Sequence, residues 1–354
     1  LGGEWADGDG APLDVRECAT GEVIGRLGTA SVEQAAEAAR VALRAGREWA
    51  ALPPAARAAV MRRAGDLFER YADEIRPWIV RESGGTWAKA ATEVLAAAAE
   101  CHEAAALPMH PQGDMLATNK DRWSMSKRVP AGVVSVIAPF NYPLTLAIRS
   151  VAPALALGNG VLLKPDPRTS VCGGVVLQRV FEEAGLPPGV LQTLPGGADV
   201  GAAVVEAPEV RIISFTGSTA AGRKVGETAA RLLKRAHLEL GGNNALIVLP
   251  DADPRQAAAA GAFGSFLHQG QICQATGRHL VHESIAEEYV AELTRIAESL
   301  RVGDPFAEED VQIGPVIDPR QTAAVESLIS DAVERGAEVR SGGTAERQFL
   351  RPTV

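Results

Sequence analysis

From Arg128 onward, short apolar runs alternate with longer amphipathic segments, and this alternation constrains the fold more than any other feature of the chain. Such strand–helix repetition predicts an α/β fold: a parallel, doubly wound sheet with helices on both faces, and ligands beyond the carboxyl ends of the strands. The expected strands are Gly132–Ile137, Gly160–Leu163, Val190–Leu194, Val210–Phe215 and Leu238–Leu240.

The length of 354 residues suits two domains, which we expect over 1–238 and 239–354. In the first, Ser31 and Gln34 form a capping-box pattern ahead of an Ala-rich helix, and a second helix is expected to start at Pro53–Pro54. Helical periodicity continues over 77–81 and 87–107. The second domain opens with strands at Ala245–Leu249 and Arg278–His282, followed by a helix over 284–300.

The composition argues against several classes of function. A net charge of −9 and the lack of any long Lys/Arg run argue against a nucleic-acid partner. Four scattered cysteines without Cys-x-x-Cys spacing predict neither a disulfide framework nor a metal site, and they indicate a reducing compartment. The uncharged stretch Val129–Ile148 contains three prolines, so we interpret it as strand, loop and helix rather than a membrane span. Without a signal-peptide pattern, the expected location is the cytoplasm.

Cys273 lies in the polar, glycine-bearing stretch Gly270–Cys273, between a helical region and the strand near Arg278. A nucleophilic thiol needs such a reachable position, together with a base or positive potential that favours the thiolate. The alternative is an inert, packed cysteine. That is the interpretation that we keep for Cys18, Cys101 and Cys172.

Three further polar side chains, Glu239, Asn141 and Lys164, follow or end expected strands. If Glu239 is buried, it can serve as a general base, whereas on a water-facing strand edge it has no such role. The amide of Asn141 can donate to an oxyanion or cap the helix expected from Pro143. Lys164 can bind ribose or phosphate, or be a solvated charge at a strand end.

The segment Phe-Thr-Gly-Ser-Thr-Ala-Ala-Gly at 215–222 follows a strand and opens a helix, so its free N–H groups can meet a phosphate. A nucleotide-hydrolysing P-loop would need Lys directly after the last glycine. Here Arg223 follows Gly222, and Lys224 comes one place late. Since Gly-x-Gly-x-x-Gly is also absent, a plain strand-to-helix turn is the alternative.

Taken in order, Pro-Phe-Asn, Lys-Pro, Phe-Thr-Gly-Ser-Thr, Glu-Leu-Gly-Gly and Gly-Gln-Ile-Cys resemble the aldehyde dehydrogenase superfamily, in particular its benzaldehyde and vanillin dehydrogenase branch. The resemblance implies a dinucleotide-binding domain over 1–238 and a catalytic domain over 239–354. It also implies that Cys273 is the nucleophile, Glu239 the general base and Asn141 the oxyanion donor.

The same resemblance implies which residues contact the ligands. Lys164 matches the contact to the adenosine ribose, and Gly217, Ser218 and Gly222 match the pyrophosphate turn. All the expected cofactor contacts are Ile137, Ala138, Pro139, Phe140, Lys164, Pro165, Arg168, Gly197, Phe215, Thr216, Gly217, Ser218, Gly222, Leu240 and Gly241. The aldehyde pocket is expected from helical neighbours of Asn141 and from the residues beside the nucleophile, which are Thr145, Arg149, Ile272 and Gln274.

The implied reaction is oxidation of an aldehyde, preferably aromatic, through a Cys273 thioester that water activated by Glu239 hydrolyses. NAD-preferring relatives carry a Glu three residues after the Lys, where this chain has Pro167 followed by Arg168. Because Arg168 can then pair with a 2′-phosphate, we expect use of NAD and NADP. The alternatives are a catalytically silent structural or binding protein of the same fold and a coenzyme A-acylating relative, against which Glu239 speaks.

The resemblance also bears on assembly. Relatives continue past Val354 into a Glu-x-Phe-Gly-Pro motif and a last strand used in oligomerisation, so the expectation is a catalytic domain incomplete at its C-terminus. For the full-length protein we expect a homodimer or homotetramer, with an oligomerisation hairpin near 113–128.

Overall fold

The computed structural model describes residues 5–354, which form two compact units. Unit 1 comprises residues 5–13, 26–75 and 93–239, and unit 2 comprises residues 14–25, 76–92 and 240–354. Residues 14–25 and 76–92 lie before the expected boundary at 238/239 yet group with unit 2. The assignment of cofactor binding and catalysis to separate domains stays a prediction.

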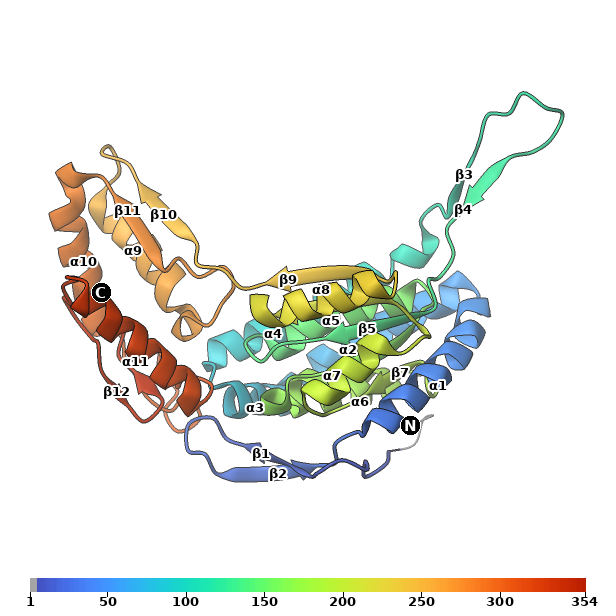
Figure 1. The fold of residues 1–354 in the computed structure, drawn as a ribbon, viewed down its shortest axis with the longest axis horizontal. Helices are drawn as coiled ribbons and strands as arrows, with labels where there is room; N and C mark the ends of the chain where they lie inside the picture. Colours follow the sequence, from blue (N-terminus) through green and yellow to red (C-terminus); the bar gives the residue numbers. More distant parts are fainter. Residues whose placement is uncertain (1–4) are drawn as a thin grey trace. The chain divides into compact units, whose positions relative to one another are not determined.

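A five-stranded sheet with the order β7-β6-β5-β8-β9 forms the centre of unit 1 (Figure 1). Its strands are β5 (Val133–Ile137), β6 (Gly160–Lys164), β7 (Leu191–Thr193), β8 (Val210–Gly217) and β9 (Arg235–Leu240). β5 pairs in parallel with β6 and β8, and β6 pairs in parallel with β7. Every residue of β5 and β6 is buried, as expected for parallel strands covered on both faces. The expected α/β sheet is confirmed.

The helices of unit 1 pack against the sheet in two separate groups, as in a doubly wound fold. One group consists of α1 (Val32–Ala51), α7 (Ala198–Glu206) and α8 (Thr219–Arg231). The other consists of α5 (Pro143–Ala156) and α6 (Val176–Glu183), with α2 (Pro54–Arg70) packed on both of them. Two further helices, α3 (Ala72–Ser83) and α4 (Trp87–Ala104), have residues in both units.

Helix α1 begins at the predicted capping box and lies very close to β6. The Ser31 side chain accepts from the backbone N–H of Gln34 at 3.1 Å, and the Gln34 side chain accepts in return from the Ser31 N–H at 3.0 Å. A Cβ placed on Gly160 would lie 2.3 Å from the carbonyl oxygen of Ala42. Only glycine therefore allows this approach of helix and strand.

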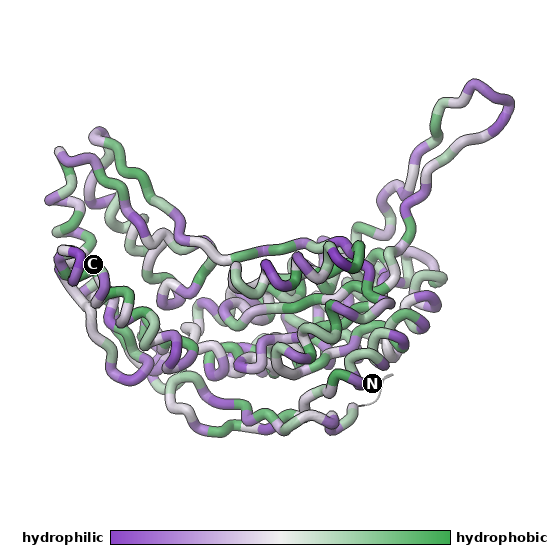
Figure 2. Tube along the Cα trace, viewed as in Figure 1, coloured by the Kyte–Doolittle hydropathy of each residue, from purple (hydrophilic) through white to green (hydrophobic). Residues whose placement is uncertain are grey.

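An antiparallel hairpin of β3 (Gly113–Met115) and β4 (Met125–Lys127) lies where the sequence predicts one. Its tip, residues 118–122, is hydrophilic (Figure 2). Large apolar side chains nevertheless stand exposed on its arms, and Trp123 is 84% exposed. A second two-stranded sheet pairs β1 (Leu13–Arg16) with β2 (Val23–Leu27).

Unit 2 is built around a parallel pair of strands, β10 (Ala245–Val248) and β11 (Arg278–Val281). Helices α9 (Pro254–Phe266) and α10 (Ala286–Ser299) pack together and contribute most of a small apolar core. The buried members of that core are Val248, Ala258, Ala262, Tyr289 and Leu293. The unit also contains α11 (Pro319–Glu334), β12 (Ala345–Glu346) and β13 (Phe349–Leu350).

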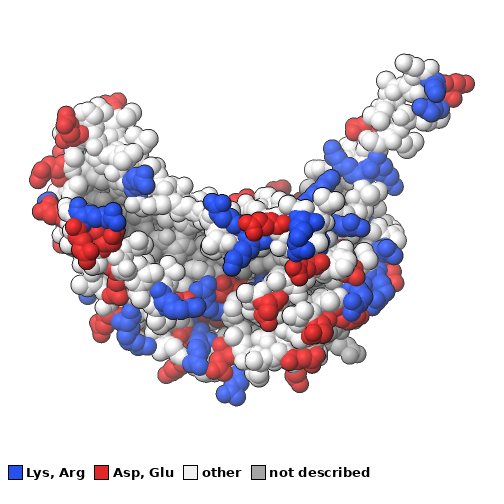
Figure 3. All heavy atoms as spheres, viewed as in Figure 1, with Lys and Arg blue, Asp and Glu red and all other residues white. Residues whose placement is uncertain are grey.

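Within residues 5–354, no helix combines the length and the apolar character needed to cross a bilayer. The uncharged stretch 129–148 forms β5, a loop and the start of α5, as predicted. On the visible surface of unit 1, Lys and Arg side chains are interspersed with Asp and Glu side chains (Figure 3).

Candidate active site

The carboxyl end of β5 carries the segment Ala138–Asn141 and leads directly into α5. Pro143 is the first residue of α5, as predicted, and Tyr142 is its N-cap residue without a side-chain capping bond. The alternative interpretation of Asn141 as the helix cap is therefore wrong. Ile137 and Ala138 are buried, whereas Pro139 is only partly covered, so this strand end is packed up to the point where the loop begins.

Glu93 on α4 is a site residue that the sequence analysis missed. Its side chain is fully buried, and Oε2 accepts from the backbone N–H groups of Leu144 at 3.1 Å and Thr145 at 3.2 Å. Those groups lack an acceptor within the helix, so the glutamate replaces a capping residue and fixes the loop that carries Asn141. The available signal was a glutamate on the same helix face as buried Ala90 and Ala97.

Lys164 ends β6 directly beside the end of β5. In the parallel register it is paired with Ile137, and its carbonyl oxygen accepts from the N–H of Ala138 at 3.1 Å. The side chain is buried, and burial lowers the pKa of the amino group below its ordinary 10.5. The alternative of a solvated end charge is therefore wrong for this lysine.

After Pro165, the chain turns so that Arg168 lies against two neighbours. Its Nε donates to Oδ1 of Asp166 at 2.9 Å, and its guanidinium carbon lies 4.3 Å from the centre of the Phe140 ring. The carboxyl end of β6 and the turn after it thus carry a buried lysine amine and an arginine that packs on the segment after β5.

The next parallel strand, β8, ends in the Phe215–Gly217 segment, and Ser218 caps α8 by accepting from the Ala221 N–H at 3.3 Å. The first N–H groups of an α-helix have no acceptor inside it, so the turn can face an anion. Gly222 lies buried within the first turns of α8. On α5, Arg149 donates to the Thr216 hydroxyl at 3.3 Å.

Helix α7 begins at Ala198, and Gly197, which follows β7, is its N-cap residue. β7, β6, β5 and β8 are neighbours in the sheet, and the pairs between them are parallel. The predicted cofactor contacts of unit 1 therefore lie together at the carboxyl ends of these strands, as in folds that bind dinucleotides. The exceptions are Leu240 and Gly241, which belong to unit 2.

Glu239 lies on the outer strand β9 and does not have the buried position that a general base was expected to have. Its side chain is 49% exposed, and its Oε1 lies 3.2 Å from Nε2 of His237, two residues earlier on the same face of the strand. The carboxylate of Glu239 therefore has a histidine as its neighbour on its own strand.

Cys273 lies in unit 2, on a turn between α9 and β11. Its side chain is exposed, whereas Cys18, Cys101 and Cys172 are buried, and all four are free thiols. Cys273 is thus the most reachable of the four, as the nucleophile interpretation requires. Ile272 and Gln274 flank it in the same turn.

Just before this turn, the backbone has an uncommon conformation. His268, Gln269 and Gly270 all have positive φ, at 48°, 57° and 69°. Left-handed conformations are rare for residues with a side chain, and they concentrate at functional sites where the surroundings hold them. The side-chain oxygen of the next residue, Gln271, accepts from the Ile317 N–H at 3.0 Å, so this residue is also held in place.

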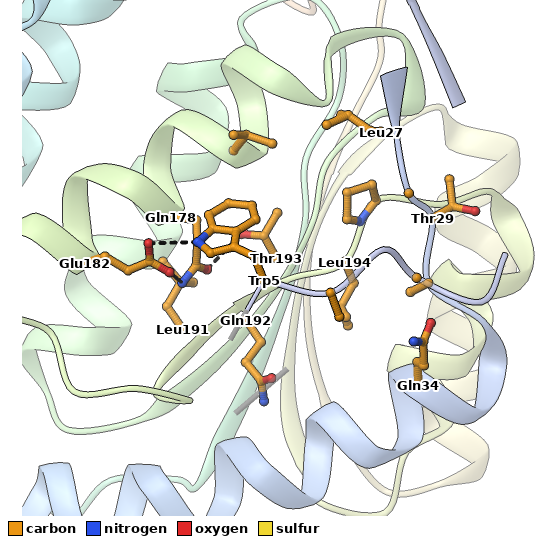
Figure 4. Close-up of a pocket in the computed structure, with 16 residues that line it drawn as sticks. Trp5, Leu27, Thr29, Gln34, Gln178, Glu182, Leu191, Gln192, Thr193 and Leu194 are labelled. Carbon is orange, nitrogen blue, oxygen red and sulfur yellow. Dashed lines mark hydrogen bonds between the residues drawn. The ribbon is translucent and has the colours of Figure 1, made fainter. Parts of the chain in front are cut away.

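A separate pocket of about 130 Å³ in unit 1 lies beside β7 and α6, and none of the predicted site residues lines it (Figure 4). Trp5 donates to Oε2 of Glu182 at 3.1 Å, and Gln178 donates to Oε1 of the same carboxylate at 3.0 Å. Thr193 donates to Gln178 at 3.1 Å. The polar groups at this pocket thus largely satisfy one another.

Comparisons with known proteins agree with the motifs. The aldehyde dehydrogenase family model matches residues 5–354. A vanillin dehydrogenase from an Amycolatopsis species is 60% identical over 352 residues, which cover 99% of this chain and 72% of the relative. The NAD(+) benzaldehyde dehydrogenase of Pseudomonas putida is 45% identical over 351 residues, with coverage of 99% and 72%.

Among solved structures, the NAD-dependent benzaldehyde dehydrogenase from Corynebacterium glutamicum superposes with a TM-score of 0.94. It is 39% identical, and the match covers 100% of this chain and 78% of that structure. Because both the family model and these relatives match nearly the whole chain, the chain belongs to the aldehyde dehydrogenase family.

Proposed function

We propose that this aldehyde dehydrogenase oxidises aromatic aldehydes to carboxylic acids with NAD or NADP, through a thioester on Cys273. The observation that carries the proposal is the reachable thiol of Cys273 on its constrained turn, beside three cysteines that are buried. The aromatic substrate class is supported by two relatives reported above, a vanillin dehydrogenase that is 60% identical and a benzaldehyde dehydrogenase that is 45% identical.

The cofactor would be held by the edge of the unit 1 sheet. Three features fit a dinucleotide there: the buried amine of Lys164, the N-terminus of α8 capped by Ser218, and the N-terminus of α7 at Gly197. When bound, the cofactor supplies a nicotinamide ring that accepts hydride. Arg168 follows Lys164 by four residues and would meet a 2′-phosphate.

In the first half of the reaction, the Cys273 thiolate attacks the carbonyl carbon of the aldehyde, and a C–S bond forms while the carbonyl oxygen takes the negative charge. The amide of Asn141 and the backbone N–H of Cys273 donate to that oxygen, which stabilises the tetrahedral state over the flat aldehyde. As the carbonyl re-forms, the hydrogen leaves as hydride, for which a bound nicotinamide would be the acceptor, and a thioester remains.

In the second half, Glu239, whose role as the base is supported by the Glu-Leu-Gly-Gly motif and not by burial, takes a proton from water, and the resulting hydroxide attacks the thioester carbon. The C–S bond breaks, the carboxylic acid leaves, and Cys273 returns to its thiolate. The presence of Glu239 favours hydrolysis over transfer of the acyl group to coenzyme A. A catalytically silent protein of this fold would not need a reachable thiol on a strained turn.

Assembly as a homodimer or homotetramer is part of the proposal. The hairpin of β3 and β4 supports it, because Trp123, Met115 and Met125 are each more than half exposed on its arms. Exposed aromatic and Met side chains on a projecting element are typical of interfaces. The substrate partner is a small aldehyde, and the four free thiols agree with a reducing, cytoplasmic setting.

The test is an aldehyde panel, aromatic and aliphatic, assayed with each cofactor for the wild type and for Cys273→Ala. We expect higher kcat/KM for aromatic aldehydes and no turnover in the variant. Cys101→Ala, which removes a buried thiol, is the matched control and should keep its activity. Turnover retained by Cys273→Ala would refute the assignment of the nucleophile.

A second variant separates the two half-reactions. Glu239→Gln should still acylate but deacylate slowly, so intact-mass spectrometry should detect an adduct of the acyl group on the protein after mixing with aldehyde and cofactor. If the variant hydrolyses the thioester at the wild-type rate, Glu239 is not the base.

A further inference from the structure

The turn that carries Cys273 is bound to a side chain for which the reaction scheme above gives no role. Asn244 stands immediately before β10 and belongs to unit 2, as does Cys273. Its Nδ2 donates to the carbonyl oxygen of Cys273 at 2.9 Å and to that of Ala275 at 3.1 Å. One side-chain amide therefore bridges the nucleophile and the second residue after it.

The backbone of Asn244 adds two more bonds to the same segment. Its N–H donates to the Ala275 carbonyl oxygen at 3.2 Å, and its own carbonyl accepts from the Arg278 N–H at 3.3 Å. A carboxamide has two N–H donors, and here each of them has an acceptor on the turn. The geometry thus uses the full donor capacity of Asn244, which no smaller or acidic side chain can reproduce.

The opposite side of the turn is held independently. The Thr276 N–H donates to the Gly264 carbonyl at 3.0 Å, and the Ser265 hydroxyl donates to the Thr276 carbonyl at 2.7 Å. Nε2 of His279 also lies 2.9 Å from that carbonyl oxygen. Because these bonds do not involve Asn244, the turn keeps its attachment to α9 and β11 when the asparagine is replaced.

We infer that Asn244 is a positioning residue for the Cys273 nucleophile. By fixing the Cys273 carbonyl, it fixes the peptide plane that follows the thiol-bearing carbon, and so the direction of the Cα–Cβ bond. A displacement of about 1 Å in a reacting atom can lower the rate about 100-fold. Asn244 is exposed and contributes little to the apolar core, so this effect is separable from folding. The inference rests on the proposed role of Cys273.

The experiment compares Asn244→Asp and Asn244→Ala with Asn243→Asp. The first keeps the shape but sets a carboxylate oxygen against two carbonyl oxygens, and the second removes both donors without adding charge. Asn243→Asp introduces the same charge one residue away and is the matched control. The Oδ1 atom of Asn243 packs against Gly277: a Cβ added to that glycine would lie 2.2 Å from it. Asn243 therefore faces a different part of the segment from the Cys273 carbonyl.

We expect kcat to fall about 10- to 100-fold in both Asn244 variants, while the aldehyde KM stays within about threefold of wild type. Asn243→Asp should keep kcat within about threefold. The fold of unit 2 is followed through Cys18, which is buried beside the Val316 carbonyl and should resist alkylation by iodoacetamide in every variant.

A wild-type kcat in Asn244→Ala would overturn the inference, and so would an equal loss in Asn243→Asp. A loss of turnover that comes with alkylation of Cys18 would also overturn it, because the asparagine would then serve folding alone. Cys273→Ala, assayed alongside, distinguishes the two proposals: if it keeps turnover, the proposed nucleophile itself is wrong, whatever the Asn244 variants show.

Discussion

The guanidinium carbon of Arg168 lies 4.3 Å from the centre of the Phe140 ring. This cation–π contact joins the loops that follow the neighbouring strands β6 and β5. Asp166 holds the same guanidinium through Nε at 2.9 Å and a terminal nitrogen at 2.8 Å. The planar group is thereby held in one orientation at the sheet edge where the cofactor is proposed to bind.

This arrangement predicts how Arg168 affects the choice of cofactor. Arg168→Ala should lower kcat/KM with NADP about 10-fold or more, since a charge-assisted bond to a 2′-phosphate is lost. The value with NAD should change little. Arg179→Ala removes another guanidinium that lies over an aromatic ring, that of Trp5 at 4.2 Å, and is the control. Equal losses with both cofactors would contradict a role in phosphate recognition.

The buried amine of Lys164 should lower the free energy of unfolding, although we propose that it helps to bind the cofactor. Because burial lowers the pKa of its amino group, the folded protein binds that proton less tightly than the unfolded chain, and stability rises as pH approaches 10.5. Lys164→Met should therefore raise the free energy of unfolding near pH 7. The expected gain is about 1.4 kcal/mol for every pH unit by which the pKa of Lys164 lies below 10.5 in the folded protein.

The advantage of Lys164→Met should shrink towards pH 10, as thermal melts at the two pH values would show, while the KM for the cofactor rises. A wild type that is more stable than Lys164→Met at pH 7 would show that the amine gains more from its surroundings than it loses by burial.

Glu93 should matter to both stability and turnover. Glu93→Gln removes the charge at the N-terminus of α5, and we expect the free energy of unfolding to fall by about 1–3 kcal/mol, with a lower kcat through the Asn141 loop. Glu103→Gln makes the same change at an exposed position of α4 and should shift stability by less than about 0.5 kcal/mol. Urea unfolding of both variants checks this, and equal shifts would argue against the capping role.

Two glycines should respond in opposite ways to alanine. Gly160→Ala places a methyl group 2.3 Å from the Ala42 carbonyl oxygen and should destabilise the protein by about 1–3 kcal/mol. A Cβ on Gly201, within α7, meets nothing within 4 Å, so Gly201→Ala should stabilise by about 0.5–1 kcal/mol. Differential scanning calorimetry compares the two, and a stabilised Gly160→Ala would mean that α1 can move away from β6.

Much of this molecule could be predicted from its sequence because the signals are local. The central strands β5 and β6 stand out since buried parallel strands must be apolar along their length. The capping box of Ser31 and Gln34 and the helix start at Pro143 depend on residues close in sequence. The aldehyde dehydrogenase motifs lie on turns at strand ends, where a few residue types fit.

The features that were not predicted depend on tertiary contacts. Glu93 caps a helix that begins 50 residues later in the chain, and no local pattern reports such a bond. His268 and Gln269 adopt left-handed conformations although neither is a glycine, so their residue types do not predict these conformations. The sequence left open whether Glu239 is buried or faces water, and its side chain is half-exposed because β9 is the outermost strand of its sheet. Segments 14–25 and 76–92 join unit 2 across long stretches of chain.

The contacts of α1 carry a consequence for biosynthesis. Nε1 of Trp49 donates to the Leu155 carbonyl, and the Gln192 side chain donates to the Ala38 carbonyl 154 residues earlier. At about 5–20 residues per second, a ribosome needs about 8–30 s to translate that interval. Within this interval β5, β6 and β7 are made one after another, so the apolar face of α1 is only partly covered until the last of them, and the nascent chain offers chaperones a binding site on that helix.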